Sequence, residues 1–225
     1  MADMRSQTAR YRVESASTRS PVEINSVLRS TYLLLAMTIA FAAVTAFVGI
    51  ALQMPFMGFI PYLIGFFGLS WAVNKTAQSA WGLVWTFAFT GFIGIAIAPI
   101  LQIYLSVNPG AVVQSLFVTA ATFVGLSAYT VIARKNFSWL GQFLTVAFFV
   151  VIGMLVASFF FDMSAFSMLI SAFMVFVACA LILYQTSAIV LGGETNYIIA
   201  ANNLFVSGYL LFMNLLALFG MGGDD

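Results

Sequence analysis

The side chains that could do chemistry inside the apolar part of this sequence are few and uncharged. Asn203, Ser207 and Asn214 fall within roughly 40° of one another at about 100° per residue, so they share one face of a helix. Gln185 lies in the preceding apolar segment. Two interpretations stay open for these residues: hydrogen bonds between helices, worth about 0.6 kcal/mol per contact, or the lining of a narrow polar pathway.

The patterns of common catalytic and metal sites are missing. The sequence has no histidine, which excludes Ser-His hydrolysis, HExxH zinc sites and histidine proton relays. No apolar segment carries an acid near its centre, so a two-aspartate intramembrane protease is excluded as well. Gly192-Gly193 is too short to cradle a phosphate, and the single cysteine, Cys179, has no partner for an intrachain disulfide. We therefore expect no enzyme activity, no cofactor and no metal site.

Composition places the chain in a membrane. It is 63% hydrophobic and 7% charged, with a mean hydropathy of +1.06. Roughly a quarter of the residues of an ordinary globular protein are charged. A surface with so little charge must face lipid, so the lipid bilayer is the first partner that the sequence predicts. The net charge of +1 and the lack of a basic face argue against a nucleic-acid partner.

Seven apolar segments predict an all-α fold, a bundle of seven transmembrane helices. A helix needs about 20 residues to cross ~30 Å of hydrocarbon, and six of the segments reach that length easily. The second segment is the shortest and contains Pro61, which would allow a kinked or re-entrant helix. The segments are Thr31–Leu52, Phe56–Val73, Trp81–Leu105, Ala111–Ala133, Phe137–Phe161, Ala165–Leu191 and Tyr197–Phe219.

The charges between these segments predict their orientation. Lysine and arginine near helix ends mark the cytoplasmic side of a membrane protein. The basic residues Arg29, Lys75, Arg134 and Lys135 fall on one side only if all seven segments cross the membrane. The other side then holds acids and no basic residue: Asp162, Asp224 and Asp225. We therefore expect the N-terminus in the cytoplasm and the C-terminus outside it.

Three regions follow from this topology. Residues 1–28 carry arginine, serine and threonine with almost no large apolar side chains, so we expect a flexible cytoplasmic tail. Residues 29–220 form the seven-helix domain, and 221–225 form a short acidic end. No cleavable signal peptide is expected, because the first apolar run is too long for one.

Small residues recur at a spacing of four in two of the segments. The pairs are Gly94/Ala98 and Ala121/Gly125. Such pairs let the backbones of two helices approach closely. We expect both pairs to serve helix packing.

Four stretches of the sequence resemble a known family. They read VLRSTYLL at 27–34, FTGFIG at 89–94 followed by APIL at 98–101, ARKNFSWLG at 133–141, and GGETNYI at 192–198. Together they resemble the Bax inhibitor-1 (TMBIM) family, and closely its bacterial, YccA-like branch, over residues 25–220. The family's seven-helix fold and cytoplasmic N-terminus agree with the topology predicted from the segments and charges.

The resemblance implies a regulator of a membrane protease. Members of the YccA-like branch bind FtsH, an AAA protease of the inner membrane, and restrain it as slow, competing substrates. The chain would then be a multi-pass inner-membrane protein acting in quality control or stress response. Residues 1–28 suit the end from which the protease starts, because an ATP-driven unfoldase needs an unstructured, water-exposed end. A tail that only sets topology is the other interpretation.

The resemblance also implies an alternative function, a calcium or cation leak. Elsewhere in the family a pH-sensitive leak depends on two aspartates in the last two spans. The first of these positions is Gln185 here, and the second falls on Ser207. Neither side chain titrates as a carboxylate pair does, so we do not expect pH gating by that mechanism. A small-solute transporter is a third class, with no positive sign in the sequence.

Six residues in the loop after the sixth segment match a motif of the family. On the resemblance the loop is cytoplasmic, and it either has a function of its own or only builds the turn into the last helix. The glycine pair suits the end of a helix, and Thr195 or Asn196 could cap the next one. The motif residues are Gly192, Gly193, Glu194, Thr195, Asn196 and Tyr197.

Overall fold

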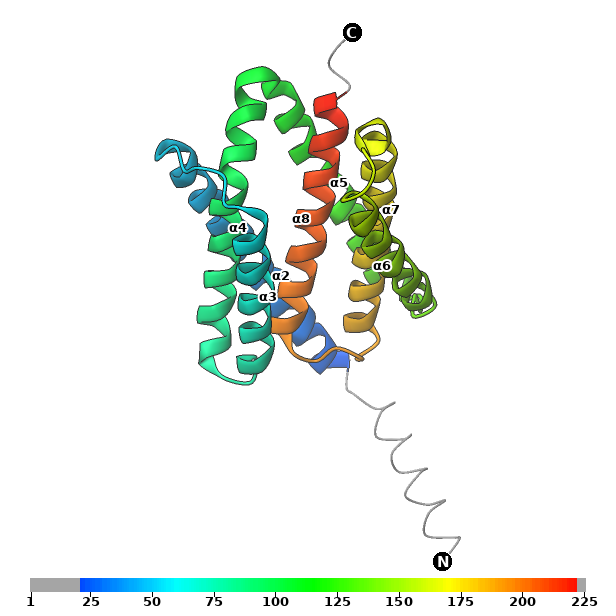
Figure 1. Ribbon diagram of the computed structural model, residues 1–225. Helices are drawn as coiled ribbons and strands as arrows, with labels where there is room; N and C mark the ends of the chain where they lie inside the picture. The colour runs from blue at the N-terminus through cyan, green and yellow to red at the C-terminus, as the bar shows by residue number, and fades with distance from the viewer. Residues whose placement is uncertain (1–20, 222–225) are drawn as a thin grey trace, which may run out of the picture.

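The computed structural model describes residues 21–221, which form seven α-helices and one short 3-10 helix and contain no strand (Figure 1). The fold class expected from the sequence, all-α, is confirmed within this range. In chain order the elements are α2 (Pro21–Ala51), α3 (Phe59–Thr76), α4 (Ala80–Val107), α5 (Pro109–Ala133), α6 (Leu140–Ala157), η1 (Ser164–Phe166), α7 (Ser167–Val190) and α8 (Tyr197–Met221).

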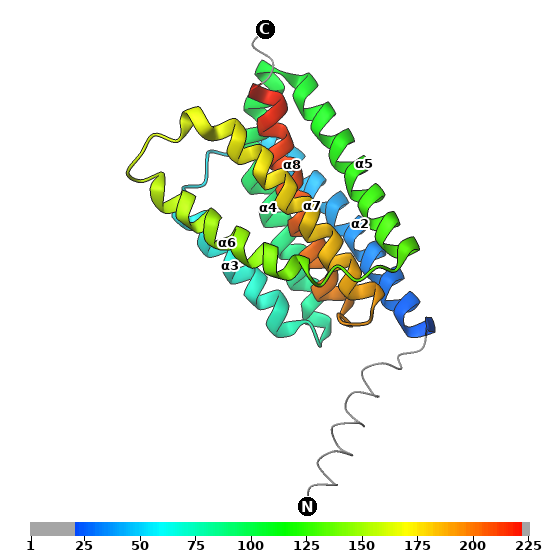
Figure 2. The same ribbon diagram turned by 90° about the vertical axis from the view of Figure 1, so that its right-hand side faces the viewer.

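Helix α8 is the central helix of the bundle. Among the described helices it contacts α2, α3, α4, α5 and α7, whereas α6 contacts α7 alone (Figures 1 and 2). One face of α8 is accordingly buried along its whole length, from Ala201 through Leu204 and Leu211 to Leu216. The largest apolar cluster joins this face to α2 and α4, with Leu34 and Phe89 among its members.

Six of the described helices are long and apolar enough to cross a membrane, and α3 is not among them. Helix α3 has 18 residues, and its last turn contains Asn74 and Lys75, which lower its apolarity. It runs beside α4 from the α3–α4 turn and covers only part of the length of α4 (Figure 1). The predicted count of seven spans is therefore supported for six helices.

The largest difference from the predicted boundaries lies at the start of α2. The sequence predicts a flexible tail through residue 28 and a first span from Thr31, but the helix begins at Pro21. Proline suits the first turn of a helix, and Glu23 adds a favourable negative charge there. Val27 and Leu28 pack against the main apolar cluster, which holds these turns in place. The remainder of the predicted tail, residues 1–20, and residues 222–225 lie outside the described range.

Prolines and the α6–α7 connection account for smaller differences. Pro61 lies in the first turn of α3, where its missing N–H group is not needed, so it does not interrupt the helix. Helix α6 ends at Ala157, whereas the sequence predicts a span reaching Phe161. The chain turns there, and η1 leads into α7.

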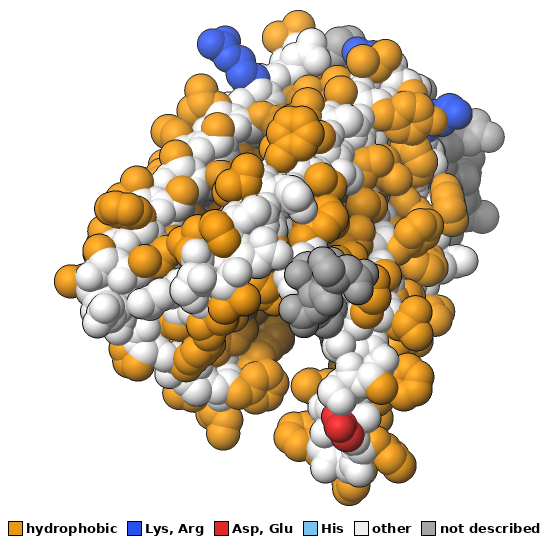
Figure 3. Space-filling model, turned by 90° about the horizontal axis from the view of Figure 1, so that it is seen from above, with side chains coloured by type: hydrophobic (Ala, Val, Ile, Leu, Met, Phe, Trp, Pro, Cys, Tyr) orange, Lys and Arg blue, Asp and Glu red, His pale blue; other side chains and the backbone are white. Residues whose placement is uncertain are grey.

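The surface of the molecule exposes large apolar side chains, as expected for contact with lipid. Large apolar side chains are exposed on every helix, as with Phe47 on α2, Phe117 on α5 and Phe148 on α6. Seen from the end where α8 terminates, apolar side chains are spread over the surface and charged ones lie toward its edges (Figure 3). Side chains that would be buried in a soluble protein here face outward, as in a protein surrounded by lipid.

Candidate functional site

The polar residues predicted on the last two long helices meet at the α7–α8 contact. The Ser207 hydroxyl is fully buried and donates to Gln185 Oε1 at 2.9 Å. The same hydroxyl lies 3.0 Å from the carbonyl oxygen of Asn203, one turn earlier in α8. Because a serine has one proton, these two acceptors share it. The structure thus brings Gln185 and Ser207 together across two helices, with Asn203 joined through its backbone.

Asn214 does not join this contact. Its side-chain Nδ2 donates to the carbonyl oxygen of Leu210 in the same helix, at 2.8 Å. The shared helix face therefore does not make one continuous chain of hydrogen bonds among the described side chains. Gln185 and Ser207 are both neutral at physiological pH, so their contact holds α7 to α8 without placing charge inside the bundle.

Other polar contacts near this level were not predicted from the sequence. The Tyr32 hydroxyl lies 3.4 Å from Thr186 Oγ1 and joins α2 to α7. The Tyr62 and Tyr209 hydroxyls lie 3.2 Å apart and join α3 to α8. Each pair is separated by more than a hundred residues, so helix periodicity could not have matched its members.

Asn202 is the most buried amide of the bundle. It is 1% exposed, and its Oδ1 atom has no hydrogen-bond partner within residues 21–221. Thr31 on α2 is equally buried, and its hydroxyl also lacks a partner there. An unsatisfied buried polar atom costs about 1–3 kcal/mol. One feature of the sequence could have singled out Asn202. It lies in an apolar segment beside Asn203, off the face that Asn203 shares with Ser207 and Asn214.

The family motif at 192–197 builds the turn between α7 and α8. Gly192 ends α7 with φ at 75°, a left-handed conformation that glycine adopts without strain. The Glu194 carboxylate accepts the backbone N–H groups of Thr195 and Asn196, both at 2.8 Å. Asn196 Oδ1 accepts from the N–H groups of Ile198 and Ile199 at 2.9 and 3.3 Å. Asn196, one of the two predicted alternatives, is therefore the N-cap of α8.

Side chains of α7 and α8 also hold the neighbouring connections at this end of the bundle. Asn196 Nδ2 donates to the carbonyl oxygen of Ala77 at 2.8 Å, which ties the start of α8 to the α3–α4 turn. Ser187 Oγ donates to the Lys135 carbonyl oxygen and accepts from the Phe137 N–H, both at 3.1 Å, and so holds the α5–α6 connection. The end of the bundle with these three connections is called the basic end below.

The basic end carries the four lysine and arginine side chains of the described range. They lie in α2, in the last turn of α3 and in the α5–α6 connection, and all are exposed: Arg29, Lys75, Arg134 and Lys135. The Lys75 ammonium lies 4.6 Å from the ring centroid of Trp71, within the range of a cation–π contact. Within residues 21–221, no three His, Cys, Asp or Glu side chains come together in a way that could hold a metal ion.

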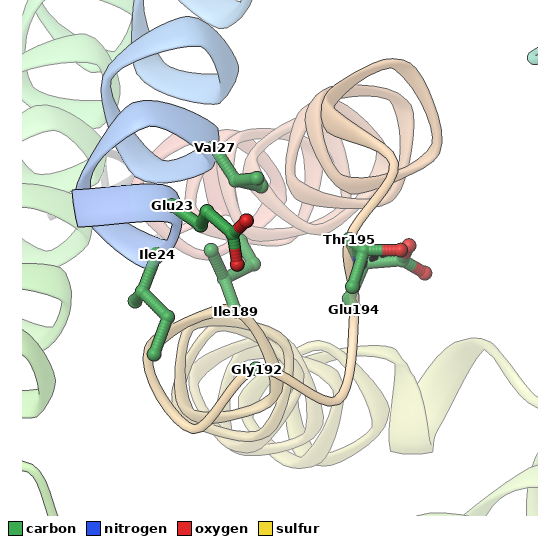
Figure 4. Close-up of a pocket in the computed structure, with 7 residues that line it drawn as sticks. All are labelled: Glu23, Ile24, Val27, Ile189, Gly192, Glu194 and Thr195. Atoms are coloured by element: carbon green, nitrogen blue, oxygen red, sulfur yellow. Dashed lines mark hydrogen bonds between the residues drawn. The ribbon is translucent and has the colours of Figure 1, made fainter. Parts of the chain in front are cut away.

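A groove opens at the basic end between the start of α2 and the α7–α8 loop (Figure 4). Its volume is about 250 Å³. Both acidic side chains of this end contribute to it, Glu23 from α2 and Glu194 from the loop. The other lining residues are Ile24, Val27, Ile189, Gly192 and Thr195.

Comparison with known proteins identifies the family. Residues 24–224 match the family model described as inhibitor of apoptosis-promoting Bax1. The chain is 47% identical over 222 residues to an uncharacterised protein of Pseudomonas aeruginosa, covering 97% of this chain and 100% of that protein. It is 41% identical over 207 residues to the modulator of FtsH protease YccA of Escherichia coli K12, covering 92% of this chain and 94% of YccA.

These relatives also agree with the resemblance found in the sequence. A second Escherichia coli relative, also 41% identical, is named inner membrane protein YccA. The name of the first Escherichia coli relative gives its function as modulation of FtsH protease. With a family match over nearly the whole chain and six apolar helices, the chain belongs to the Bax inhibitor-1 family and is a multi-pass protein of the bacterial inner membrane.

Proposed function

We propose that the protein binds an FtsH-like membrane AAA protease and restrains it, as part of membrane-protein quality control or a stress response. The observation that carries this proposal is the 41% identity to the modulator YccA over 92% of the chain. Similarity of that extent includes the helices, the loops at the basic end and the turn motif. The bundle itself offers a stable, lipid-facing body against which a membrane protease could pack.

The proposal includes a topology with the basic end in the cytoplasm. Arg29, Lys75, Arg134 and Lys135 lie at this end, and Asp162 is the only charged side chain of the described range that does not. That distribution matches the positive-inside rule if α3 crosses the membrane with the other six helices. At about 1.5 Å per residue, the 18 residues of α3 extend about 27 Å, close to the thickness of the hydrocarbon layer. The C-terminal end of α8 then lies outside the cytoplasm.

In this scheme residues 1–20 are the segment that the protease engages first. They directly precede α2, whose first residue lies at the basic end. The proposed protease is a cytoplasmic unfoldase that must begin from a chain end in water. The packed bundle behind this segment resists extraction, which would make the protein a slow substrate that occupies the protease.

Removal of residues 2–20 tests this proposal. The truncated protein should insert into the membrane normally, because every described helix is retained, but its degradation by a purified FtsH-like protease should stop. Pulse-chase turnover in cells and degradation in detergent measure this directly. Removal of residues 222–225, at the other end of the chain, is the matched control and should leave turnover unchanged. Equal turnover of the full-length and N-terminally truncated proteins would refute the proposed role of residues 1–20.

A calcium or cation leak remains the second candidate, and one observation bears on it. On the resemblance, the positions of the two aspartates of the leak branch correspond to Gln185 and Ser207, whose side chains are joined by a hydrogen bond. The contact between α7 and α8 at these two positions therefore carries no charge. We expect liposomes containing the protein to show background calcium flux at both acidic and neutral pH. Protein-dependent flux would favour the leak over protease modulation.

A further inference from the structure

We infer that the groove between α2 and the α7–α8 loop binds an arginine side chain from the chain's own residues 1–20. This inference rests on the proposed function, because binding there would shield the segment from the protease. The groove holds about 250 Å³ and has apolar walls formed by Ile24, Val27 and Ile189. The Glu23 carboxylate points into the space between α2 and the loop, and Glu194 lines the groove from the loop with its side chain directed away from α2 (Figure 4).

The chemistry of the groove fits an arginine. The methylene stem of an arginine packs on aliphatic walls while its guanidinium group reaches carboxylates at the rim. The rest of the basic end repels such a group, since the four basic side chains there outnumber its two acids, and both acids line this groove. A cation approaching this end is therefore drawn to the groove rather than to the surrounding surface.

The segment that precedes α2 is rich in arginine. Residues 1–20 contain four arginines, Arg5, Arg10, Arg12 and Arg19, and the segment leads directly into Pro21. Glu23 and Ile24, in the first turns of α2, line the groove, so the segment enters the fold within a few residues of it. Ten extended residues span up to about 35 Å, so the more distant arginines can also fold back to reach it.

Anionic lipid headgroups compete for the same arginines. Each basic side chain near an anionic membrane surface gains about 1 kcal/mol, which corresponds to roughly a fivefold change in occupancy. Binding in the groove and binding to headgroups depend on different groups. Binding in the groove needs Glu23 and Glu194, whereas binding to headgroups needs anionic lipid and neither glutamate.

Limited digestion with trypsin tests the inference without any protease partner. Trypsin cleaves after arginine, and mass spectrometry reports the cleavage rate at each of the four sites. In detergent without anionic lipid, one arginine should be cleaved more slowly than the others. Glu23→Gln and Glu194→Gln should each speed cleavage at that site about 2- to 5-fold, the range for a partly exposed ion pair. Glu194→Gln keeps an oxygen that can accept from the Thr195 and Asn196 amides, so the turn is retained.

An acidic residue far from the groove provides the control. Asp162→Asn, in the α6–α7 connection, should leave all four cleavage rates unchanged. Equal cleavage at every arginine in the wild type, or acceleration by Asp162→Asn as well, would overturn the inference. Protection that appears only with anionic lipid and survives both glutamate variants would overturn it in favour of the membrane surface.

The same variants separate the inference from the proposed function. If the groove shields the segment, Glu194→Gln should also increase the rate of degradation by the FtsH-like protease. Protection from trypsin, with no degradation by that protease even in Glu194→Gln, would refute the proposed role of residues 1–20 as the end that the protease engages and leave the groove contact standing. Degradation of a wild type whose arginines are all cleaved equally would refute only the groove contact.

Discussion

The small-residue pairs of α4 and α5 have the same spacing but opposite surroundings. Gly94 and Ala98 of α4 lie against α2, where a Cβ atom on Gly94 would collide with Thr45 Oγ1 and with the carbonyl oxygen of Ala42. On α5, Gly125 is exposed, and a Cβ atom there would have no neighbour within 4 Å. Packing was expected for both pairs, and only the α4 pair shows it within the described residues.

The comparison shows what four-residue spacing can and cannot decide. Small residues make close approach possible, but only a facing helix with its own small residues makes it happen. Helix α2 provides that partner: a Cβ atom on its Gly49 would lie 2.6 Å from the Ala98 Cβ. Helix α5 turns Gly125 away from the bundle, toward lipid. A glycine is therefore required for helix packing at position 94, whereas at position 125 a larger residue would fit.

Replacing the two glycines by alanine should give changes in stability of opposite sign. Gly94→Ala should lower the free energy of unfolding by about 1–3 kcal/mol, because the methyl group meets a backbone oxygen that cannot move aside easily. Gly125→Ala should raise it by up to about 1 kcal/mol, because alanine favours a helix more than glycine does. Unfolding in mixed micelles with increasing SDS measures both. A loss of stability in Gly125→Ala would show that this face packs on another molecule.

A second pair of matched residues extends the comparison to the loops. Asn196 caps α8 and also bonds to the Ala77 carbonyl oxygen, so it connects two parts of the fold. Asn136 is exposed, and its Oδ1 accepts only the nearby N–H of Ser138, at 2.8 Å. Asn196→Ala should cost about 1–2 kcal/mol in unfolding free energy, and Asn136→Ala no more than about 0.5 kcal/mol. Similar losses in the two variants would mean that neither the cap nor the link to Ala77 adds to the stability of the fold.

These contrasts also explain how far the sequence could predict the molecule. Apolar length located the helices well, and helix-ending chemistry located Gly192 and Asn196, because both depend on neighbouring residues in the chain. The early start of α2 was missed, since its first turns are held by packing of Val27 and Leu28 on distant helices. For α3 the sequence predicts the shortest segment, and the helix has 18 residues; it ends at Thr76 rather than Val73, so its last turn includes the polar residues Asn74 and Lys75.

The candidate site shows the same limit. Periodicity placed Asn203, Ser207 and Asn214 on one face, and the resemblance pointed to Gln185 and Ser207, but neither could supply the register between α7 and α8. That register decides that Ser207 meets Gln185 and that Asn214 bonds within its own helix. Asn202 Oδ1 is left without a hydrogen-bond partner among residues 21–221, which helix periodicity alone does not predict.

The smallest expected effect concerns the contact between Gln185 and Ser207. A double-mutant cycle with Gln185→Ala and Ser207→Ala should give a coupling energy of about 0.6 kcal/mol, the usual worth of a hydrogen bond between membrane helices. The matched cycle with Gln185→Ala and Asn214→Ala should give no coupling, because Asn214 bonds to its own backbone. SDS unfolding of the three single variants, the two double variants and the wild type provides both values. Coupling of Gln185 to Asn214 as strong as to Ser207 would mean that the polar face acts as one unit, as a pathway lining would. Coupling to Ser207 alone would mean that the face is divided between one bond across helices and one within α8, which suits a closed bundle that a protease must pull apart.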